Sequence, residues 1–237
     1  MQKIKTVILC GGKGTRMGGD ELPKVLFPIG GKPILWHIMS IYSHYGFDDF
    51  ILCLGYKGEK IKEYFSNLNK WKTVFAETGE DTNTGGRIKR IKEFIKEDYF
   101  LATYGDGVAD INLKKLVKFH LKHNKSATIT VTRPFSQFGI VGVDPHNQAV
   151  THFEEKPILD HWINGGFFVF NRNIFRYLKD DDILEKDSFR RILKDRQLDA
   201  FKHPGFWRCM DTYKDNLELN NLWKSGKAAW KIWSPQP

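Results

Sequence analysis

The chain has 237 residues, 41% hydrophobic and 27% charged, and no apolar run approaches the roughly 18–20 residues of a membrane span, so we expect one globular domain without a membrane partner. The net charge is +9, but Lys and Arg are spread along the chain, which argues against a nucleic-acid partner and favours anionic small substrates and solvated helix faces. Cys10, Cys53 and Cys209 are far apart and form no C-x-x-C pair, which argues against a disulfide framework or a zinc site and favours a reducing cytoplasm.

The first predicted element is a short buried strand at residues 6–10, and a glycine-rich turn follows it directly. The turn reads GGKGTR from Gly11 to Arg16, with Pro23-Lys24 shortly afterwards. Glycines let backbone N–H groups approach an anionic ligand closely, because no Cβ stands in the way. Arg16 and Lys24 add two positive charges. Strand, glycine turn and cations together predict a phosphate-binding loop.

Three known designs compete for this loop. A P-loop needs Gly-Lys-Ser/Thr after four intervening residues, and no such run exists. A dinucleotide fingerprint fits Gly12 and Gly14, but Met17 stands where its third glycine belongs and Gly18 comes one residue late. The third design reads G-G-x-G-T-R followed by P-K. Gly11 to Arg16 and Pro23-Lys24 match it at every motif position. The alternative to all three designs is a glycine-rich loop that only reverses the chain direction and binds no ligand.

The first half of the chain alternates apolar runs with helically spaced apolar residues. This order predicts a parallel sheet covered by helices on both faces, with ligands at the C-terminal edge of the strands. The glycine loop, Tyr56-Lys57, Thr84 to Gly86 and Asp106 all follow strands, so we expect them to converge. The predicted helices cover 33–45, the region of Ile61 and Phe65, and the region of Ile88 to Ile95; the predicted strands cover 50–54, 73–76 and 99–104.

The second half continues the pattern without a repeat, a low-complexity segment or a linker, which predicts a single domain over residues 1–237. A strongly apolar run at 162–170 is expected to form a central strand. The other predicted strands cover 127–132, 139–143, 149–154 and 198–201, and the predicted helices cover 113–123, 183–193 and 211–223.

Two carboxylates are candidates for a metal site. Asp106 ends a predicted strand between two glycines, which leave room for water and phosphate oxygens around a hard cation such as Mg²⁺. One carboxylate rarely holds Mg²⁺ by itself, and Asp211 is the candidate partner. Asp211 could instead cap the closing helix, and Asp110 could be a helix N-terminal residue.

A second polar cluster comes late in the chain. Lys156 is a candidate for binding a second phosphate, while Glu155 and Asn164 are candidates for hydrogen-bonding sugar hydroxyls. The alternatives are an exposed loop pair for Glu155-Lys156 and a β-bulge for Asn164-Gly165-Gly166.

Over nearly its full length and in order, the sequence resembles the sugar nucleotidyltransferases, and most narrowly those that act on glucose 1-phosphate with CTP in bacterial polysaccharide pathways. GGxGTR is common to the family, whereas GDGVAD, INGGFF and the tryptophan-rich ending are narrower. The matching motifs are GGKGTR (11–16), GGKPILWHIM (30–39), GYKG with IKEYF (55–65), TGGR (84–87), YGDGVAD (104–110), FEEKP (153–157), INGGFF (163–168), HPGFW (203–207), MDT (210–212) and LWKSGKAAWKIW (222–233).

The resemblance implies a Rossmann-like, GT-A-like α/β fold with a mixed, mostly parallel sheet flanked by helices. It places nucleotide binding at about residues 1–112 and sugar-phosphate binding at about 113–237. The implied reaction transfers CMP from CTP to a sugar 1-phosphate, with Mg²⁺ as cofactor and release of pyrophosphate. A homo-oligomer is a further implied possibility. Another nucleotide or acceptor with the same chemistry is the main alternative, and an NAD-dependent oxidoreductase or a non-catalytic nucleotide-binding protein is the alternative from another class.

The resemblance also implies roles for individual residues. The implied catalytic residues are Arg16, Lys24 and Asp106, and the implied metal ligands are Asp106 and Asp211. The implied nucleotide-binding residues are Leu9, Gly11, Gly12, Gly14, Thr15, Arg16, Lys24, Thr84, Gly85, Gly86 and Asp106. The implied substrate-binding residues are Tyr104, Glu155, Lys156, Asn164 and Gly165.

Overall fold

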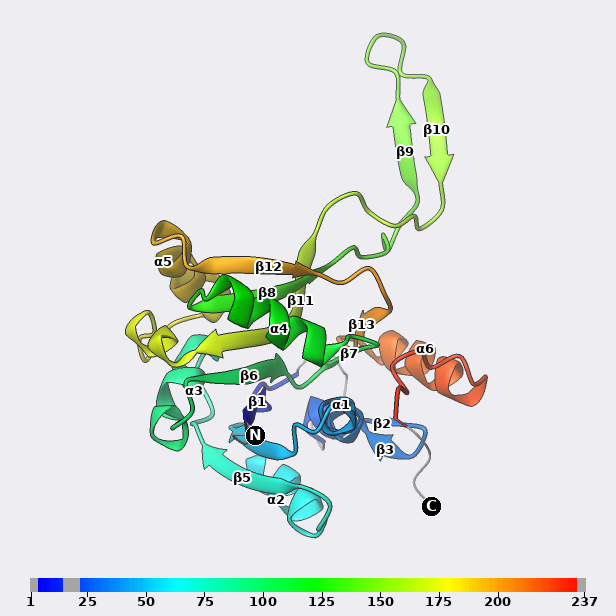
Figure 1. Cartoon of the computed structure of the whole chain (residues 1–237). Helices are drawn as coiled ribbons and strands as arrows, with labels where there is room; N and C mark the ends of the chain where they lie inside the picture. The colour runs from blue at the N-terminus through cyan, green and yellow to red at the C-terminus, as the bar shows by residue number, and fades with distance from the viewer. Residues whose placement is uncertain (1–3, 15–21, 234–237) are drawn as a thin grey trace.

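A seven-stranded sheet forms the centre of the molecule in the computed structural model, which describes residues 4–14 and 22–233. The strands lie in the order β12-β8-β11-β6-β1-β4-β5 (Figure 1). Among the described residues, β11 alone runs antiparallel to its sheet neighbours, β6 and β8. The predicted mixed, mostly parallel sheet is therefore confirmed. The strands are β1 (Lys5–Leu9), β4 (Asp49–Leu54), β5 (Lys72–Glu77), β6 (Tyr99–Tyr104), β8 (Ala127–Thr132), β11 (Ile163–Asn171) and β12 (Leu198–Lys202).

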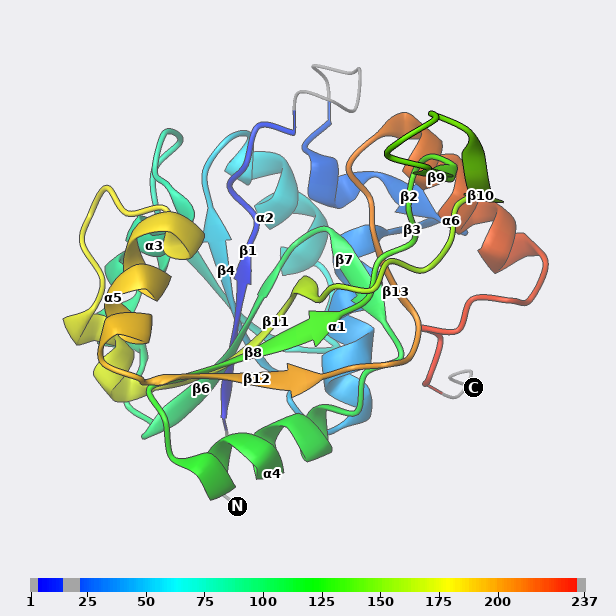
Figure 2. The ribbon, with the colours of Figure 1, turned by 90° about the horizontal axis from the view of Figure 1, so that it is seen from above.

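Helices cover both faces of the sheet because its strands are apolar on both sides. In β1, Ile8 packs with α1, α2 and α4 on one face, while Val7 and Leu9 pack with α3 and α5 on the other. Figure 2 shows α4 and α5 on either side of the edge strand β12, which both helices contact. The helices are α1 (Ile34–His44), α2 (Gly58–Ser66), α3 (Thr84–Arg90), α4 (Leu113–His123), α5 (Phe189–Lys194) and α6 (Tyr213–Lys224).

Three helix starts differ from the sequence prediction. Helix α1 begins at Ile34, with Pro33 as its N-cap residue, one position later than expected. Helix α3 begins at Thr84 and includes both glycines that were expected to precede it. Helix α6 begins at Tyr213, because Thr212 and Asp215 form a capping box there. Asn112, not Asp110, is the N-cap residue of α4.

Three short strand pairs lie beside the main sheet. β2 (Pro28–Ile29) pairs with β3 (Lys32–Pro33), and β7 (Gly107–Ala109) pairs with β13 (Trp207–Cys209); these strands were not predicted. The predicted strands β9 (Ile140–Val143) and β10 (Val150–Glu154) form a hairpin that projects from the body of the molecule in Figure 1. The hairpin carries several exposed apolar side chains, Val143, Val150 and Phe153 among them.

Over residues 4–14 and 22–233, each helix is too short or too polar to cross a bilayer. All three cysteines are free thiols, with Cys10 and Cys53 buried.

Candidate active site

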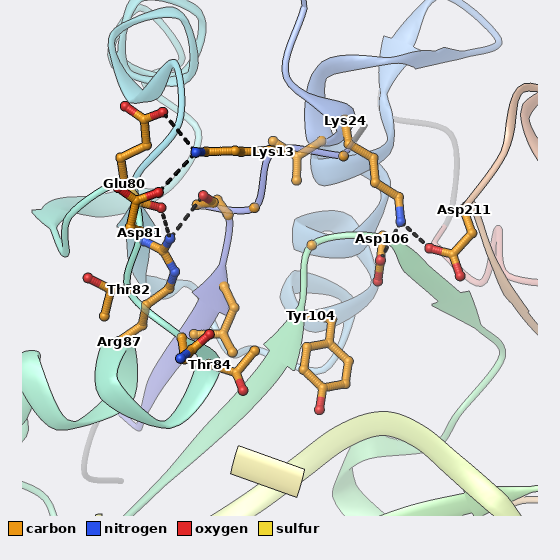
Figure 3. Close-up of a pocket in the computed structure, with 18 residues that line it drawn as sticks. Lys13, Lys24, Glu80, Asp81, Thr82, Thr84, Arg87, Tyr104, Asp106 and Asp211 are labelled. Carbon is orange, nitrogen blue, oxygen red and sulfur yellow. Dashed lines mark hydrogen bonds and ion pairs between the residues drawn. The ribbon is translucent and has the colours of Figure 1, made fainter. Parts of the chain in front are cut away.

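A cavity of about 500 Å³ opens at the C-terminal edge of the parallel strands (Figure 3). We call it the glycine-loop pocket. The ends of β1 and β6, the loop between β5 and α3, and the start of η2 (Lys24–Leu26) contribute to its wall. The predicted site residues in its lining are Leu9, Gly11, Gly12, Gly14, Lys24, Thr84, Tyr104, Asp106 and Asp211. Thr15 and Arg16 lie outside the described residues.

Lys24 joins the two predicted metal ligands. Its ammonium nitrogen lies 2.7 Å from Asp106 Oδ2 and also contacts Asp211 Oδ1 (Figure 3). Only 11% of the Lys24 side chain is exposed. Burial lowers the pKa of Lys24, but the two carboxylates outweigh burial, and the net pKa is raised. Lys24 is therefore a fixed positive charge between two carboxylates.

The pairing of β7 with β13 brings these two carboxylates together across more than a hundred residues. Cys209 lies opposite Gly107, and the Met210 N–H donates to the Asp106 carbonyl at 2.8 Å. Asp106 directly precedes one of these strands, and Asp211 closely follows the other. Because β7 begins beside the point where β13 ends, Asp106 and Asp211 lie next to each other, and both contact Lys24.

The capping alternative for Asp211 is wrong. Thr212 is the N-cap residue of α6, and its hydroxyl accepts from the Asp215 N–H at 3.2 Å. Asp215 accepts in return from the N–H groups of Asp211 and Thr212, at 3.0 and 2.7 Å. The helix is therefore capped without the Asp211 carboxylate, which is directed toward Lys24 instead.

Arg87 is a pocket residue to which the sequence analysis assigned no role. It is 4% exposed, and its guanidinium donates to carbonyl and hydroxyl oxygens on three segments. The acceptors are Gly11 O at 2.9 Å, Leu54 O at 2.9 Å, Thr78 Oγ1 at 2.7 Å, Gly79 O at 2.8 Å and Glu80 O at 3.0 Å. A Cβ on Gly11 would lie 2.1 Å from Arg87 Nη1, so this glycine is needed for the close approach. Arg87 thus ties the glycine loop to the opposite wall of the pocket.

The three residues predicted to bind the base, Thr84 to Gly86, do not all face the pocket. Thr84 lines the pocket, whereas neither glycine is among its lining residues. The Gly85 and Gly86 N–H groups donate to the Asp182 carbonyl at 2.9 and 3.2 Å. A Cβ on Gly86 would lie 2.1 Å from the Asp180 carbonyl oxygen. In this structure the glycines allow α3 to pack against residues 180–182, and their N–H groups are already used.

An ion pair joins two walls of the pocket near the glycine loop. Lys13 Nζ lies 2.9 Å from Asp81 Oδ1 and 3.5 Å from Glu80 Oε1 (Figure 3). All three side chains are about half exposed or more, so solvent weakens the attraction between them. These residues line the pocket, although the sequence analysis gave none of them a role.

A second cavity, of about 190 Å³, adjoins the first, and we call it the Trp207 pocket. Tyr104, Asp106 and Asp211 line both cavities. Asn164 and Gly165 line the second cavity, as does Trp207, whose indole N–H donates to the Gly165 carbonyl at 2.7 Å. The expected bulge is present, because the pairing of β11 with β8 shifts register between Asn164 and Phe168. Asn164 Oδ1 accepts from the Gly166 N–H at 3.0 Å within the bulge.

The structure does not bring Glu155 and Lys156 into the lining of either cavity. Both are exposed at the base of the β9–β10 hairpin and lie 3.5 Å from each other as an ion pair. Their positions match the exposed loop pair that the sequence left open as the alternative.

A metal site made by protein ligands alone is not present among residues 4–14 and 22–233, because no three His, Cys, Asp or Glu side chains converge there. Asp106 and Asp211 nevertheless converge on one cation, the Lys24 ammonium. Two carboxylates beside the glycine-loop pocket suit Mg²⁺, which is usually bound through one or two carboxylates and keeps waters and phosphate oxygens as its other ligands. The donor set therefore fits Mg²⁺.

Comparison with known proteins supports the sequence resemblance. Residues 5–225 match the family model described as Nucleotidyl transferase. The "Probable glucose-1-phosphate cytidylyltransferase" of Bacillus subtilis (strain 168) is 46% identical over 256 residues, covering 97% of this chain and 100% of the relative. The glucose-1-phosphate cytidylyltransferase of Salmonella typhimurium (strain LT2) is 43% identical over 258 residues, with the same coverage. The crystal structure of HddC from Yersinia pseudotuberculosis complexed with GMP-PN has a TM-score of 0.73 and 25% identity, covering 93% of this chain and 99% of that one.

Proposed function

Because this chain belongs to the nucleotidyl transferase family, we propose that it transfers CMP from CTP to glucose 1-phosphate, forming CDP-glucose and releasing pyrophosphate. The observation that carries the proposal is the full-length similarity to two relatives named glucose-1-phosphate cytidylyltransferase. The arrangement of the site is consistent with it, since two adjoining cavities share Tyr104, Asp106 and Asp211.

We assign the nucleotide to the glycine-loop pocket and the sugar phosphate to the Trp207 pocket. Apart from Asp211, the first pocket is built from residues before 112, while the second also takes Asn164, Gly165 and Trp207. This division follows the proposed nucleotide part at about 1–112 and sugar-phosphate part at about 113–237. The reacting groups would then meet where the cavities adjoin, beside Lys24.

The chemistry is an in-line attack of a sugar 1-phosphate oxygen on the α-phosphorus of CTP. Such a reaction depends on alignment and on neutralising charge rather than on a covalent intermediate. Lys24 would supply positive charge to the phosphates from a fixed position. The glycine loop would bring backbone N–H groups to the same phosphates, and Arg16 would add a further charge there.

Asp106 and Asp211 would hold Mg²⁺, which supplies charge neutralisation on the phosphate oxygens when bound. In that state the two carboxylates would share their negative charge between the metal and the Lys24 ammonium. Lys24 would then be less tightly held and better able to contact phosphate.

The direct test is pyrophosphate release with Mg²⁺ and glucose 1-phosphate, comparing CTP with UTP, dTTP, ATP and GTP. We expect turnover with CTP well above turnover with the other four nucleotides. Turnover restricted to a different nucleotide would contradict the assigned base. If CTP is used only with another sugar phosphate, the assigned acceptor is wrong and the reaction class stands.

A further inference from the structure

Glu185 contacts one predicted residue of each pocket, although no role was assigned to it from the sequence. It lies on the π-helical turn η5 (Leu184–Ser188), which packs beside the start of α3. Its Oε2 accepts from the Thr84 hydroxyl at 3.1 Å, and its Oε1 accepts from the Tyr104 hydroxyl. One carboxylate therefore contacts a residue of the glycine-loop pocket and a residue common to both pockets.

The direction of these two hydrogen bonds follows from elementary chemistry. An ionised carboxylate has no proton, so it can only accept, and each hydroxyl has only one proton to donate. The hydroxyl groups of Thr84 and Tyr104 must therefore both donate their hydrogen bond to the Glu185 carboxylate. The Leu184 N–H also donates to Thr84 Oγ1 at 2.9 Å, and Asn164 Nδ2 lies 3.4 Å from the Tyr104 oxygen. What the two hydroxyls can still offer to a ligand is a lone pair.

The backbone on either side of Glu185 is held in place, although the Glu185 side chain itself is exposed. The Asp182 carbonyl accepts from the Gly85 and Gly86 N–H groups, which joins residues 180–185 to the start of α3. Asp187 Oδ2 accepts from the Ile183 N–H at 2.8 Å and fixes the beginning of the turn.

We propose that Glu185 sets the hydrogen-bond polarity of Thr84 and thereby selects cytosine over uracil. The inference rests on the proposed function. The two bases differ at position 4, which carries an amino donor in cytosine and a carbonyl acceptor in uracil, and at N3, which accepts in cytosine and carries a proton in uracil. The inference concerns the group at position 4. A Thr84 oxygen that can only accept suits the amino group. The carbonyl would meet another lone pair and lose the hydrogen bond that it makes with water, which disfavours UTP.

The same constraint acts on the sugar side through Tyr104. Its oxygen can accept a hydrogen bond from a sugar hydroxyl but cannot donate one while Glu185 holds its proton. Loss of Glu185 should therefore also weaken sugar-phosphate binding. Thr84 and the group of Lys24, Asp106 and Asp211 are well separated in Figure 3, so a change at Thr84 should alter base selection more than the chemical step.

The decisive variant is Glu185→Gln, which keeps the shape of the side chain. A glutamine amide donates from its nitrogen, so one of the two hydroxyls can accept from it and turn its own proton toward the ligand. We expect the ratio of kcat/KM for CTP over UTP to fall at least about tenfold, mainly through the two KM values. Thr84→Val should lower the same ratio, and the double variant should lower it little further. Lys186→Ala, an exposed neighbour on the same turn, is the matched control and should match the wild type.

Equal ratios in Glu185→Gln and wild type, with turnover on CTP intact, would overturn the inference and leave the proposed function standing. A wild-type chain that turned over no nucleotide would defeat the proposed function instead. In that case the inference would be tested by equilibrium binding, comparing the ratio of the CTP and UTP dissociation constants between the wild type and Glu185→Gln. Thermal unfolding of each variant checks that folding is preserved, and Glu185→Asp provides a second variant that retains an accepting carboxylate.

Discussion

At the scale of single residues, the site depends on a lysine held between two carboxylates. Lys24 contacts both Asp106 and Asp211, and each of these carboxylates is part of the metal proposal and lines both pockets. We expect Asp106→Asn to reduce kcat by about 10²-fold or more while the fold persists, because charge stabilisation in the transition state is lost. The measurement is pyrophosphate release beside a circular dichroism melting curve. Asp98→Asn, just before β6 at its opposite end and exposed, is the control and should retain full activity. Full activity in Asp106→Asn would refute both its metal role and its catalytic role.

At the scale of elements, a capping box begins α6 without using the Asp211 carboxylate. The Thr212 hydroxyl accepts from the Asp215 N–H in the first turn, and the Asp215 carboxylate accepts from the N–H groups of Thr212 and Asp211. Thr212→Ala should lower the free energy of unfolding by about 1 kcal/mol, the usual effect of losing an N-cap hydroxyl. It should also lower kcat, because the Asp215 carboxylate, which accepts from the Asp211 N–H, loses the hydrogen bond from the Thr212 hydroxyl that helps to position it. Urea unfolding and pyrophosphate release measure the two effects, and Thr212→Ser should restore both. A stable variant with reduced kcat would separate positioning of Asp211 from helix stability.

At the scale of the whole molecule, the C-terminal segment packs back onto α1 through a buried histidine. His37 donates through Nε2 to the Ile29 carbonyl at 2.8 Å, and its Nδ1 lies 3.4 Å from the Trp230 indole nitrogen. Burial lowers the pKa of His37 to about 4, only partly offset by backbone hydrogen bonds. Between pH 6.5 and about 4, His37 is therefore protonated in the unfolded chain but mostly neutral in the folded chain. Stability should be constant with respect to this group above pH 6.5 and fall between pH 6.5 and about 4, by on the order of 3 kcal/mol in total.

The measurement is urea unfolding at pH 7.5 and pH 4.5. His37→Gln should reduce the loss of stability between these two values, whereas His146→Gln, in the exposed turn of the β9–β10 hairpin, should not. His120 is also buried with a pKa lowered to about 4, so part of the pH dependence should remain in His37→Gln. An unchanged pH dependence in His37→Gln would exclude His37 as its source.

The order of strands and helices could be predicted from local patterns. An apolar run bounded by glycine, or apolar residues at helical spacing, reports burial within a window of a few residues. The runs at Tyr99–Tyr104, Leu113–His123 and Ala127–Thr132 accordingly have the predicted bounds. The glycine loop was equally local, because its chemistry requires consecutive glycines after a strand. The roles of Arg16, Glu155 and Lys156 stay predictions, as do the homo-oligomer and the cytoplasmic location.

Three features depended on partners far away in the sequence, and only the tertiary structure decided them. The pairing of β7 with β13 places Asp211 beside Asp106, and the capping box of Thr212 and Asp215 contradicts the capping alternative for Asp211. Helix α3 includes Gly85 and Gly86 because the Asp182 carbonyl accepts their N–H groups, which no local propensity could indicate. Nothing in the local sequence distinguishes Arg87 or Glu185 from other charged residues. Only the fold brings backbone and hydroxyl acceptors to Arg87 and two hydroxyl donors to Glu185. The sequence by itself determined the seven strands of the main sheet, the approximate extent of the helices and the glycine loop, because these need only neighbours. The pairing of β7 with β13, the shape of the site and its hydrogen-bond polarity needed contacts that exist only in the folded chain.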